Sequence, residues 1–172
     1  MKKISFQADV LPLKNVLFRL ALRITLNRAE AEDVVQETMM KVWNQRDSWD
    51  KIDSIEAFCL TICRNLSLDK MRHMDNHSAS LEEEGHETAD NSYGANPEEL
   101  AVQHDRIAIV RRIIDQLPEK QRTVMQLRDM ENKSYRDIAT IMGISEEQVK
   151  VNIFRARQTI KKEFLKQERY GL

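Results

Sequence analysis

The stretch SYRDIATIMGISEEQVKVNIFRARQTIKKEF, residues 134–164, decides the fold, because it has the spacing of two helices joined by a tight turn. Apolar residues recur at steps of three and four on both sides of Gly143, and glycine adopts left-handed backbone geometry at little cost. Ser134 and Ser145 each stand where a helix N-cap is expected, and Gln148 completes a capping box with Ser145. The stretch therefore predicts a helix-turn-helix.

The second helix of this pair carries cations and apolar residues together on its outward face. Its inward residues are expected to be Val149, Ile153, Ala156 and Ile160. The remaining, outward residues are Lys150, Val151, Asn152, Phe154, Arg155 and Arg157. Exposed apolar side chains beside lysine and arginine suit the thymine methyls and phosphates of a DNA major groove. The alternative is an amphipathic helix whose basic face contacts only solvent.

The composition of the whole chain favours a helical, intracellular protein. Its 172 residues include only four glycines and three prolines, too few for the many tight turns of an all-β fold. No apolar run approaches the length of a membrane span, and the first ten residues lack the apolar core of a secretory signal. With two cysteines, the chain is expected to be reduced and cytoplasmic.

Charge is segregated along the chain, although the formal net charge is only −1. Residues 76–99 contain seven acidic residues and no lysine or arginine, whereas residues 100–172 contain 15 basic against 10 acidic residues. The acidic segment is rich in Ser, Asn and Gly and has no apolar period, which is typical of a flexible linker. We therefore expect an all-α protein with two small helical domains, residues 1–75 and 98–172, joined by a linker over 76–97.

Three helical patterns fill the first 75 residues. One covers about 12–26, a second follows a possible N-cap at Asn27, and a third follows a possible N-cap at Asp53. In the second pattern Glu30, Asp33 and Glu37 stand at steps of three and four, so they form one acidic stripe. Such a stripe suits a basic partner helix, and it also suits a surface exposed to solvent.

Two segments resemble the sigma-70 family of RNA polymerase factors in its small extracytoplasmic-function branch. The second half carries Leu-Pro-Glu-x-Gln-Arg from Leu117, Gly-Ile-Ser from Gly143, and Val-Lys followed by Arg-Ala-Arg, as region 4 does. The first half carries Ala-Glu-Asp-Val-Val-Gln-Glu-Thr from Ala31 and a helix around RNLSLDKMR, residues 64–72, as region 2 does. The resemblance implies a promoter-specificity subunit of RNA polymerase that is not an enzyme.

The same resemblance implies roles for particular residues. Contacts with the −35 element are implied for Ser145, Gln148, Lys150, Val151, Asn152, Phe154 and Arg155. Contacts with the melted −10 strand are implied for Trp49, Arg64, Asn65, Lys70 and Arg72, with Trp49 as a stacking surface. Contacts with the clamp helices of the largest polymerase subunit are implied for Asp33, Gln36 and Glu37. Region 4 of relatives also binds the polymerase flap, and relatives are commonly held inactive by a membrane-associated anti-sigma factor.

Several alternatives stay open from the residues alone. Trp43 is expected to pack in the core, although it could also supply a stacking surface, and Asp69 is a possible intrahelical partner of Arg72. The residues Cys59, Cys63, His73 and His77 have spacings that could ligate zinc, although cysteines on an apolar face more often pack as small hydrophobes. No catalytic, cofactor or phosphate-loop pattern is legible, so we expect no cofactor. A stand-alone helix-turn-helix regulator with an unrelated first domain is the competing class of protein.

Overall fold

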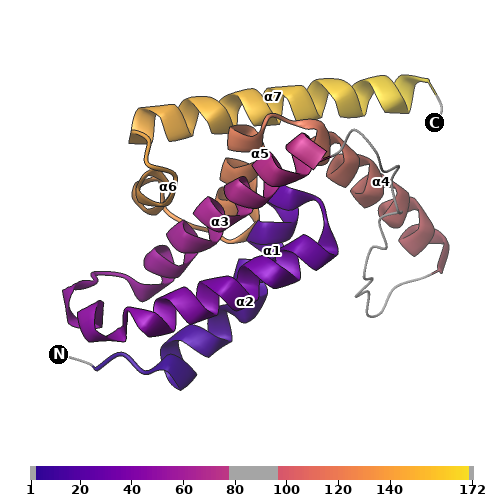
Figure 1. Cartoon of the computed structure of the whole chain (residues 1–172). Coiled ribbons are helices and arrows are strands. Elements are labelled where there is room, and N and C mark those ends of the chain that lie inside the picture. The colour runs from indigo at the N-terminus through magenta and orange to yellow at the C-terminus, as the bar shows by residue number, and fades with distance from the viewer. Residues whose placement is uncertain (1–2, 78–96, 171–172) are drawn as a thin grey trace.

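The computed structural model describes residues 3–77 and 97–170, which we call the first and the second module. The expected linker, residues 76–97, therefore falls outside the described residues except at its two ends. Every regular element of the two modules is helical (Figure 1), as the all-α prediction required. In chain order the elements are η1 (Phe6–Val10), η2 (Leu11–Leu13), α1 (Lys14–Thr25), α2 (Arg28–Asn44), η3 (Arg46–Lys51), α3 (Ile55–His77), α4 (Pro97–Gln116), α5 (Glu119–Met125), η4 (Gln126–Met130), α6 (Tyr135–Met142) and α7 (Glu146–Arg169).

In the first module, α1, α2 and α3 pack against one another. Asn27 caps α2, because its side chain accepts a hydrogen bond from Glu30 N at 3.0 Å, as expected. The cap of α3 is Ser54 and not Asp53: its Oγ accepts from Ala57 N at 3.2 Å. The correction moves the helix start by one residue. Helix α3 buries Cys59, Leu60, Cys63 and Leu66.

In the second module, the helix-turn-helix forms as the sequence predicts. Ser134 caps α6 through a bond from Asp137 N, and Gly143 ends that helix in left-handed geometry at φ 65°. Ser145 then caps α7 with both bonds of the capping box to Gln148. Helices α4 and α5 pack along α7, and the inward face of α7 buries Val149, Ile153 and Ala156.

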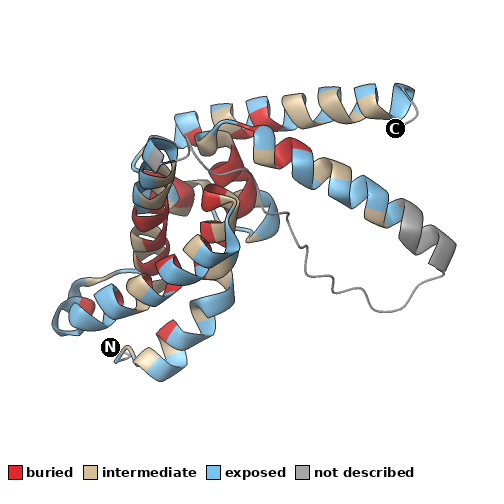
Figure 2. Ribbon diagram, turned by 45° about the vertical axis from the view of Figure 1, so that its right-hand side comes forward, coloured by how far each residue is buried: buried red, intermediate tan, exposed pale blue. Residues whose placement is uncertain are grey.

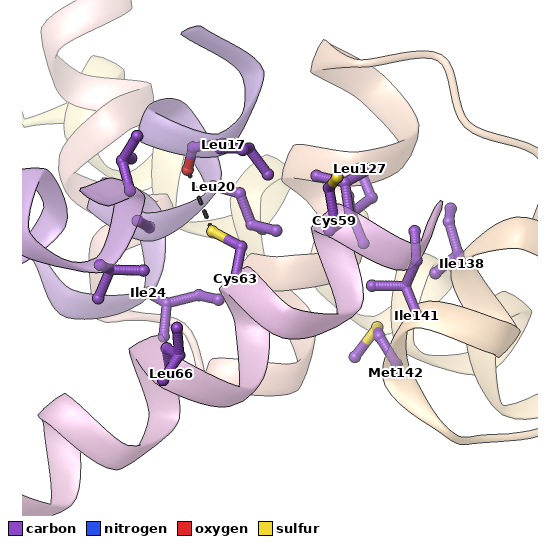
Figure 3. Packing of buried hydrophobic residues seen from close by; sticks show 14 of the residues in the cluster. Leu17, Leu20, Ile24, Cys59, Cys63, Leu66, Leu127, Ile138, Ile141 and Met142 are labelled. Carbon is purple, nitrogen blue, oxygen red and sulfur yellow. Dashed lines mark hydrogen bonds between the residues drawn. The ribbon is translucent and has the colours of Figure 1, made fainter. Parts of the chain in front are cut away.

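The two modules share one hydrophobic core, which the sequence did not predict. Buried residues of α1, α2 and α3 belong to the same cluster as Leu127 of η4 and Ile138, Ile141 and Met142 of α6. Figure 3 shows Leu127 beside Cys59 of α3. Helix α3 therefore lies between α1 and α2 on one side and α6 on the other, and Figure 2 shows buried residues running through this junction. The structure is closed, with the modules packed together.

Both cysteines belong to this core. Cys63 Sγ donates a hydrogen bond to Leu17 O at 3.3 Å, and both thiols are buried and free. Burial raises the pKa of Cys59 and of Cys63 to about 12, so both thiols are protonated and unreactive at neutral pH. Among the described residues, no three His, Cys, Asp or Glu side chains lie close enough together to hold a metal ion. The cysteines act here as small hydrophobes.

Candidate nucleic-acid interface

The first two turns of α7 present a preorganised outward edge. The capping box uses the side chains of Ser145 and Gln148, with Gln148 Oε1 accepting from Ser145 N and Ser145 Oγ accepting from Gln148 N, both at 3.1 Å. Asn152 Nδ2 donates to Gln148 O at 2.8 Å. Three of the seven predicted −35 residues are therefore engaged within the helix itself. Their polar atoms fix the start of α7, and they have less freedom to contact a base.

The other four residues of this edge are exposed. Val151 is 45% exposed and Phe154 is 64% exposed, which confirms the outward apolar positions expected from the sequence. Lys150 Nζ lies 5.5 Å from the ring centroid of Tyr135, which tethers the ammonium group loosely beside α6. Arg155 is exposed and makes no polar contact within the described residues. These four side chains form an edge with two apolar groups and two cations, a combination whose chemistry suits a DNA major groove.

Arg157, further along α7, already forms an ion pair within the second module. Its Nη2 lies 2.6 Å from Asp129 Oδ1, and this hydrogen bond raises the pKa of Arg157. The bond joins α7 to η4 within the second module. Arg157 therefore orients α7 and offers a partly neutralised charge to a partner, whereas Arg155 offers a free one.

The predicted −10 residues of α3 divide into exposed and engaged groups. Asn65 and Arg72, seven residues apart on one face of the helix, are both exposed. Arg72 Nη1 lies 3.6 Å from Asp69 Oδ1, so the suspected intrahelical pair is confirmed. Lys70 Nζ lies 2.7 Å from Asp33 Oδ2, and this bond raises the pKa of Lys70. Arg64 is only 8% exposed, in the junction between the modules.

The exposure of the two tryptophans is the reverse of what the sequence predicted: Trp43 is half-exposed and Trp49 is buried. Trp43 is 46% exposed, where its ring stacks under the Arg46 guanidinium at 4.5 Å, so its assignment to the core was wrong. Trp49 is only 7% exposed, and its Nε1 donates to Val42 O at 3.1 Å. The interpretation of Trp49 as an accessible stacking surface is therefore wrong for this conformation. The short helix η3 folds Trp49 back onto α2, a tertiary contact that periodicity does not show.

The acidic stripe of α2 is outward, as predicted. Asp33 and Gln36 are exposed and Glu37 is half-buried, so all three stand on the side away from the core. Met40, four residues after Gln36, continues this side and is 65% exposed. Met40 was not among the predicted residues, although it is an apolar residue that falls outside the helical period of the buried Val34, Thr38 and Val42. The structure also joins this stripe to α3, because Lys70 reaches both Asp33 and, at 3.6 Å, Glu30.

The junction between the modules contains buried polar bonds centred on Arg122. Its Nε donates to Arg23 O and its Nη2 to Ile24 O, both at 3.1 Å, at the carbonyl end of α1. Its Nη1 donates to Leu117 O at 2.8 Å within the second module. The carbonyl end of a helix favours a cation, although burial lowers the pKa of Arg122. One guanidinium thus connects the two modules.

Four further polar contacts of the junction are made by Arg23 and Arg64 of the first module. Arg23 Nε donates to Gln126 Oε1 and Arg23 Nη1 to Asp115 Oδ1, both at 3.1 Å. Arg64 Nη2 lies 3.4 Å from Glu119, and its Nη1 donates to Met142 O at 3.4 Å. We call the buried and half-buried polar set of this junction the clasp: Arg23, Arg64, Glu119, Arg122 and Gln126.

At the rim of the same junction lie two ion pairs. Arg19 Nε bonds to Glu131 Oε1 at 2.6 Å, which raises the pKa of Arg19. Lys133 Nζ bonds to Glu56 Oε1. Sequence analysis predicted no role for the clasp residues other than Arg64. For Arg122 and Gln126 the indication in the sequence is their position among the apolar residues Val124, Met125 and Leu127.

Comparison with known proteins gives the family. The family profile of Sigma-70 region 2 matches residues 10–76, and that of Sigma-70, region 4 matches residues 107–160. The chain is 33% identical over 149 residues to the ECF RNA polymerase sigma factor SigL of Mycobacterium tuberculosis, covering 85% of this chain and 81% of that one. It is 28% identical over 163 residues to the ECF RNA polymerase sigma factor SigW of Bacillus subtilis, covering 91% and 87%.

Solved structures agree with the sequence comparison. The sigma factor RpoE of Bartonella quintana, solved in complex with the anti-sigma factor NepR, superposes with a TM-score of 0.73 at 26% identity, over 94% of this chain and 96% of that one. CnrH, solved with the cytosolic domain of CnrY, shares the fold with a TM-score of 0.64 at 20% identity. Among the residues the structure describes, no helix is long and apolar enough to cross a membrane. The chain belongs to the extracytoplasmic-function branch of the sigma-70 family of RNA polymerase sigma factors.

Proposed function

We propose that this chain binds core RNA polymerase in the cytoplasm and directs it to promoters, as a specificity subunit and not as an enzyme. The observation that carries the proposal is the edge of α7. It offers Lys150 and Arg155 for phosphates or base edges, and Val151 and Phe154 for apolar base surfaces. The matches to region 2 before residues 78–96 and to region 4 after them support the proposal, because these two regions would bind the −10 and the −35 element.

Within the second module, the exposed edge of α7 would recognise duplex DNA, and the capping box of α7 would hold that edge in position. Lys150, Val151, Phe154 and Arg155 would contact the −35 element. Ser145, Gln148 and Asn152 would contribute mainly by holding the N-terminus of α7, where backbone N–H groups also suit a phosphate.

Within the first module, the proposal assigns the melted −10 strand to α3 and the polymerase to α2. Asn65 is exposed for strand contact, and so is Arg72 beside its intrahelical partner Asp69. Lys70 and Arg64 become available when their present partners release them. Asp33, Gln36 and Glu37 would bind the basic side of a clamp helix, and exposed Met40 would add an apolar anchor to that contact.

We also propose that an anti-sigma factor regulates this chain and can hold it near the membrane. The support is the whole-chain similarity to the Bartonella quintana chain that was solved with such a partner. The segment 76–97 would then act as the linker between domains 1–75 and 98–172.

Variants that separate the two activities test the proposal. Arg155→Ala and Lys150→Ala should each weaken binding to promoter duplex by about 1–3 kcal/mol, without weakening binding to core polymerase. Asp33→Ala with Glu37→Ala should do the reverse. Fluorescence anisotropy with labelled duplex and with labelled core enzyme measures both. Arg136→Ala, an exposed change on α6, serves as the matched control. Equal loss of both activities in the α7 variants would contradict the proposal.

A further inference from the structure

A major groove offers two kinds of base contact, and the outward edge of α7 is better equipped for one of them. Hydrogen-bonding readout of adenine uses an amide whose oxygen and nitrogen both face the base, whereas thymine presents a methyl group to apolar side chains. Gln148 Oε1 already accepts from Ser145 N at 3.1 Å, and Asn152 Nδ2 already donates to Gln148 O at 2.8 Å. Each amide therefore has one of its two groups engaged within the helix, which disfavours amide readout of adenine.

Val151 and Phe154 supply the apolar contact. Val151 is 45% exposed and Phe154 is 64% exposed, within the first three turns of α7. Residues three apart on a helix have Cβ atoms about 5–6 Å from each other, so the two side chains form one apolar strip. Because the strip is exposed in the free chain, it gains free energy when a partner removes it from water.

Of these two side chains, Val151 is the better suited to read a group as small as a methyl. Its branched side chain is stiff at χ1, so little rotamer freedom is lost when it packs against a base. It also lies nearer the N-terminus of α7, the end at which a recognition helix contacts base edges. The capping box of Ser145 and Gln148 fixes this end of the helix.

The cations beside the strip position the helix on DNA. Lys150 directly precedes Val151, and Arg155 directly follows Phe154. Contacts between cations and phosphates fix the register of a protein on the duplex but carry no sequence information. Arg155 is the alternative reader of a base, because a guanidinium forms a bidentate pair with guanine. A methyl contact of Val151 and a guanine contact of Arg155 are distinguished by the base that each requires.

We propose that Val151 is a specificity-determining residue, which selects the −35 element of this chain by packing its side chain against the 5-methyl group of a thymine. The inference rests on the proposed function, because it needs α7 to lie in the major groove of that element. Losing one buried group of the size of a methyl lowers the affinity about fourfold.

Uracil tests the methyl contact, because it pairs as thymine does and lacks only the 5-methyl group. A promoter whose start site requires the chain is randomised over its −35 element, and holoenzyme assembled from the chain and core polymerase selects the duplexes that it binds. We expect one selected position to require thymine, and uracil there to lower the affinity of holoenzyme about fourfold, as measured by anisotropy of labelled duplex. At the same position, 5-methylcytosine should bind more tightly than cytosine by the same factor.

Variants of the chain assign the methyl contact to Val151. Holoenzyme with Val151→Ser should bind the thymine and uracil duplexes equally well. The matched control is Leu165→Ser, the same kind of change at another exposed apolar residue of α7, and it should keep the preference for thymine. Arg155→Ala should weaken binding to both duplexes by one factor. Circular dichroism and unchanged binding to core polymerase show that Val151→Ser is folded.

The outcomes separate this proposal from the proposed function. If uracil binds as well as thymine throughout the element, if the selected element contains no thymine on either strand, or if Val151→Ser keeps the preference for thymine, the role of Val151 is wrong and the proposed function stands. If core polymerase yields the same start sites with and without the chain, the proposed function itself is contradicted, and the role of Val151 with it.

Discussion

Replacement of Arg122 by methionine should destabilise the folded chain strongly, because Arg122 supplies hydrogen bonds to three carbonyls. Methionine fills much of the same volume but cannot donate to Leu117 O, Arg23 O or Ile24 O. Two effects compete. Burial lowers the pKa of Arg122, so removing the charge recovers part of its desolvation cost. The change also leaves three acceptors without this donor, at about 1–3 kcal/mol for each that stays buried.

The lost acceptor bonds should outweigh the recovered desolvation. Breaking one side of a buried charged network commonly costs about 3–5 kcal/mol, and we expect Arg122→Met to fall in this range. With a urea dependence of about 2–3 kcal/mol/M for a chain of this size, the unfolding midpoint should fall by about 1–2.5 M. Because Arg122 connects the modules, the transition should also become less cooperative.

Urea unfolding followed by circular dichroism measures the effect, with Arg136→Met as the matched control. Arg136 is exposed on α6 and its side chain has no polar partner within the described residues, so the same chemical change there should shift the free energy of unfolding by less than about 0.5 kcal/mol. If Arg122→Met and Arg136→Met unfold at the same urea concentration, the junction is not held by Arg122 and the description of the clasp is wrong.

Three further predictions concern the turn, the cap and the buried thiols. Gly143→Ala should cost about 1–2 kcal/mol in urea unfolding, because φ is 65° and a Cβ there would meet no atom within 4 Å; Gly143→Asn should cost less, and equal costs would contradict a purely backbone origin. Ser145→Ala should cost about 1 kcal/mol and weaken binding to promoter duplex, whereas an unchanged melting temperature would show that the capping box does not matter. Burial raises the pKa of Cys59 and Cys63 to about 12, whereas unfolded thiols titrate near about 8.5, so stability should be lost progressively as pH rises between these values, by up to about 1.4 kcal/mol per pH unit and thiol. The double variant Cys59→Ala, Cys63→Ala should lack this pH-dependent loss, and parallel pH profiles of the native and variant chains would refute the assignment.

Local sequence patterns predicted the helix-turn-helix of the second module and the outward edge of α7 well. The glycine turn and the Ser145 capping box depend on residues within a few positions of one another, so spacing alone located them. The outward positions of Val151 and Phe154 followed from the helical period, because a helix that buries Val149 and Ile153 must place these two residues on its opposite side.

Contacts between distant segments were not predictable in the same way. Trp49 is buried because η3 folds it onto α2. Trp43 is half-exposed although it directly follows the buried Val42. Arg64 matched a family motif for strand contact, yet in the closed chain it bonds to Glu119, 55 positions away. Such pairings depend on how two helical modules dock, and no period or spacing within one module encodes that geometry.

The central claim is that this chain gives core RNA polymerase its promoter specificity. The most direct measurement is in vitro transcription by purified core enzyme on genomic DNA of the source organism, with and without the chain, followed by sequencing of transcript 5′ ends. The account predicts discrete start sites that require the chain and disappear with Arg155→Ala. It would be contradicted if the chain bound duplex DNA by itself but added no start sites to those of core enzyme alone.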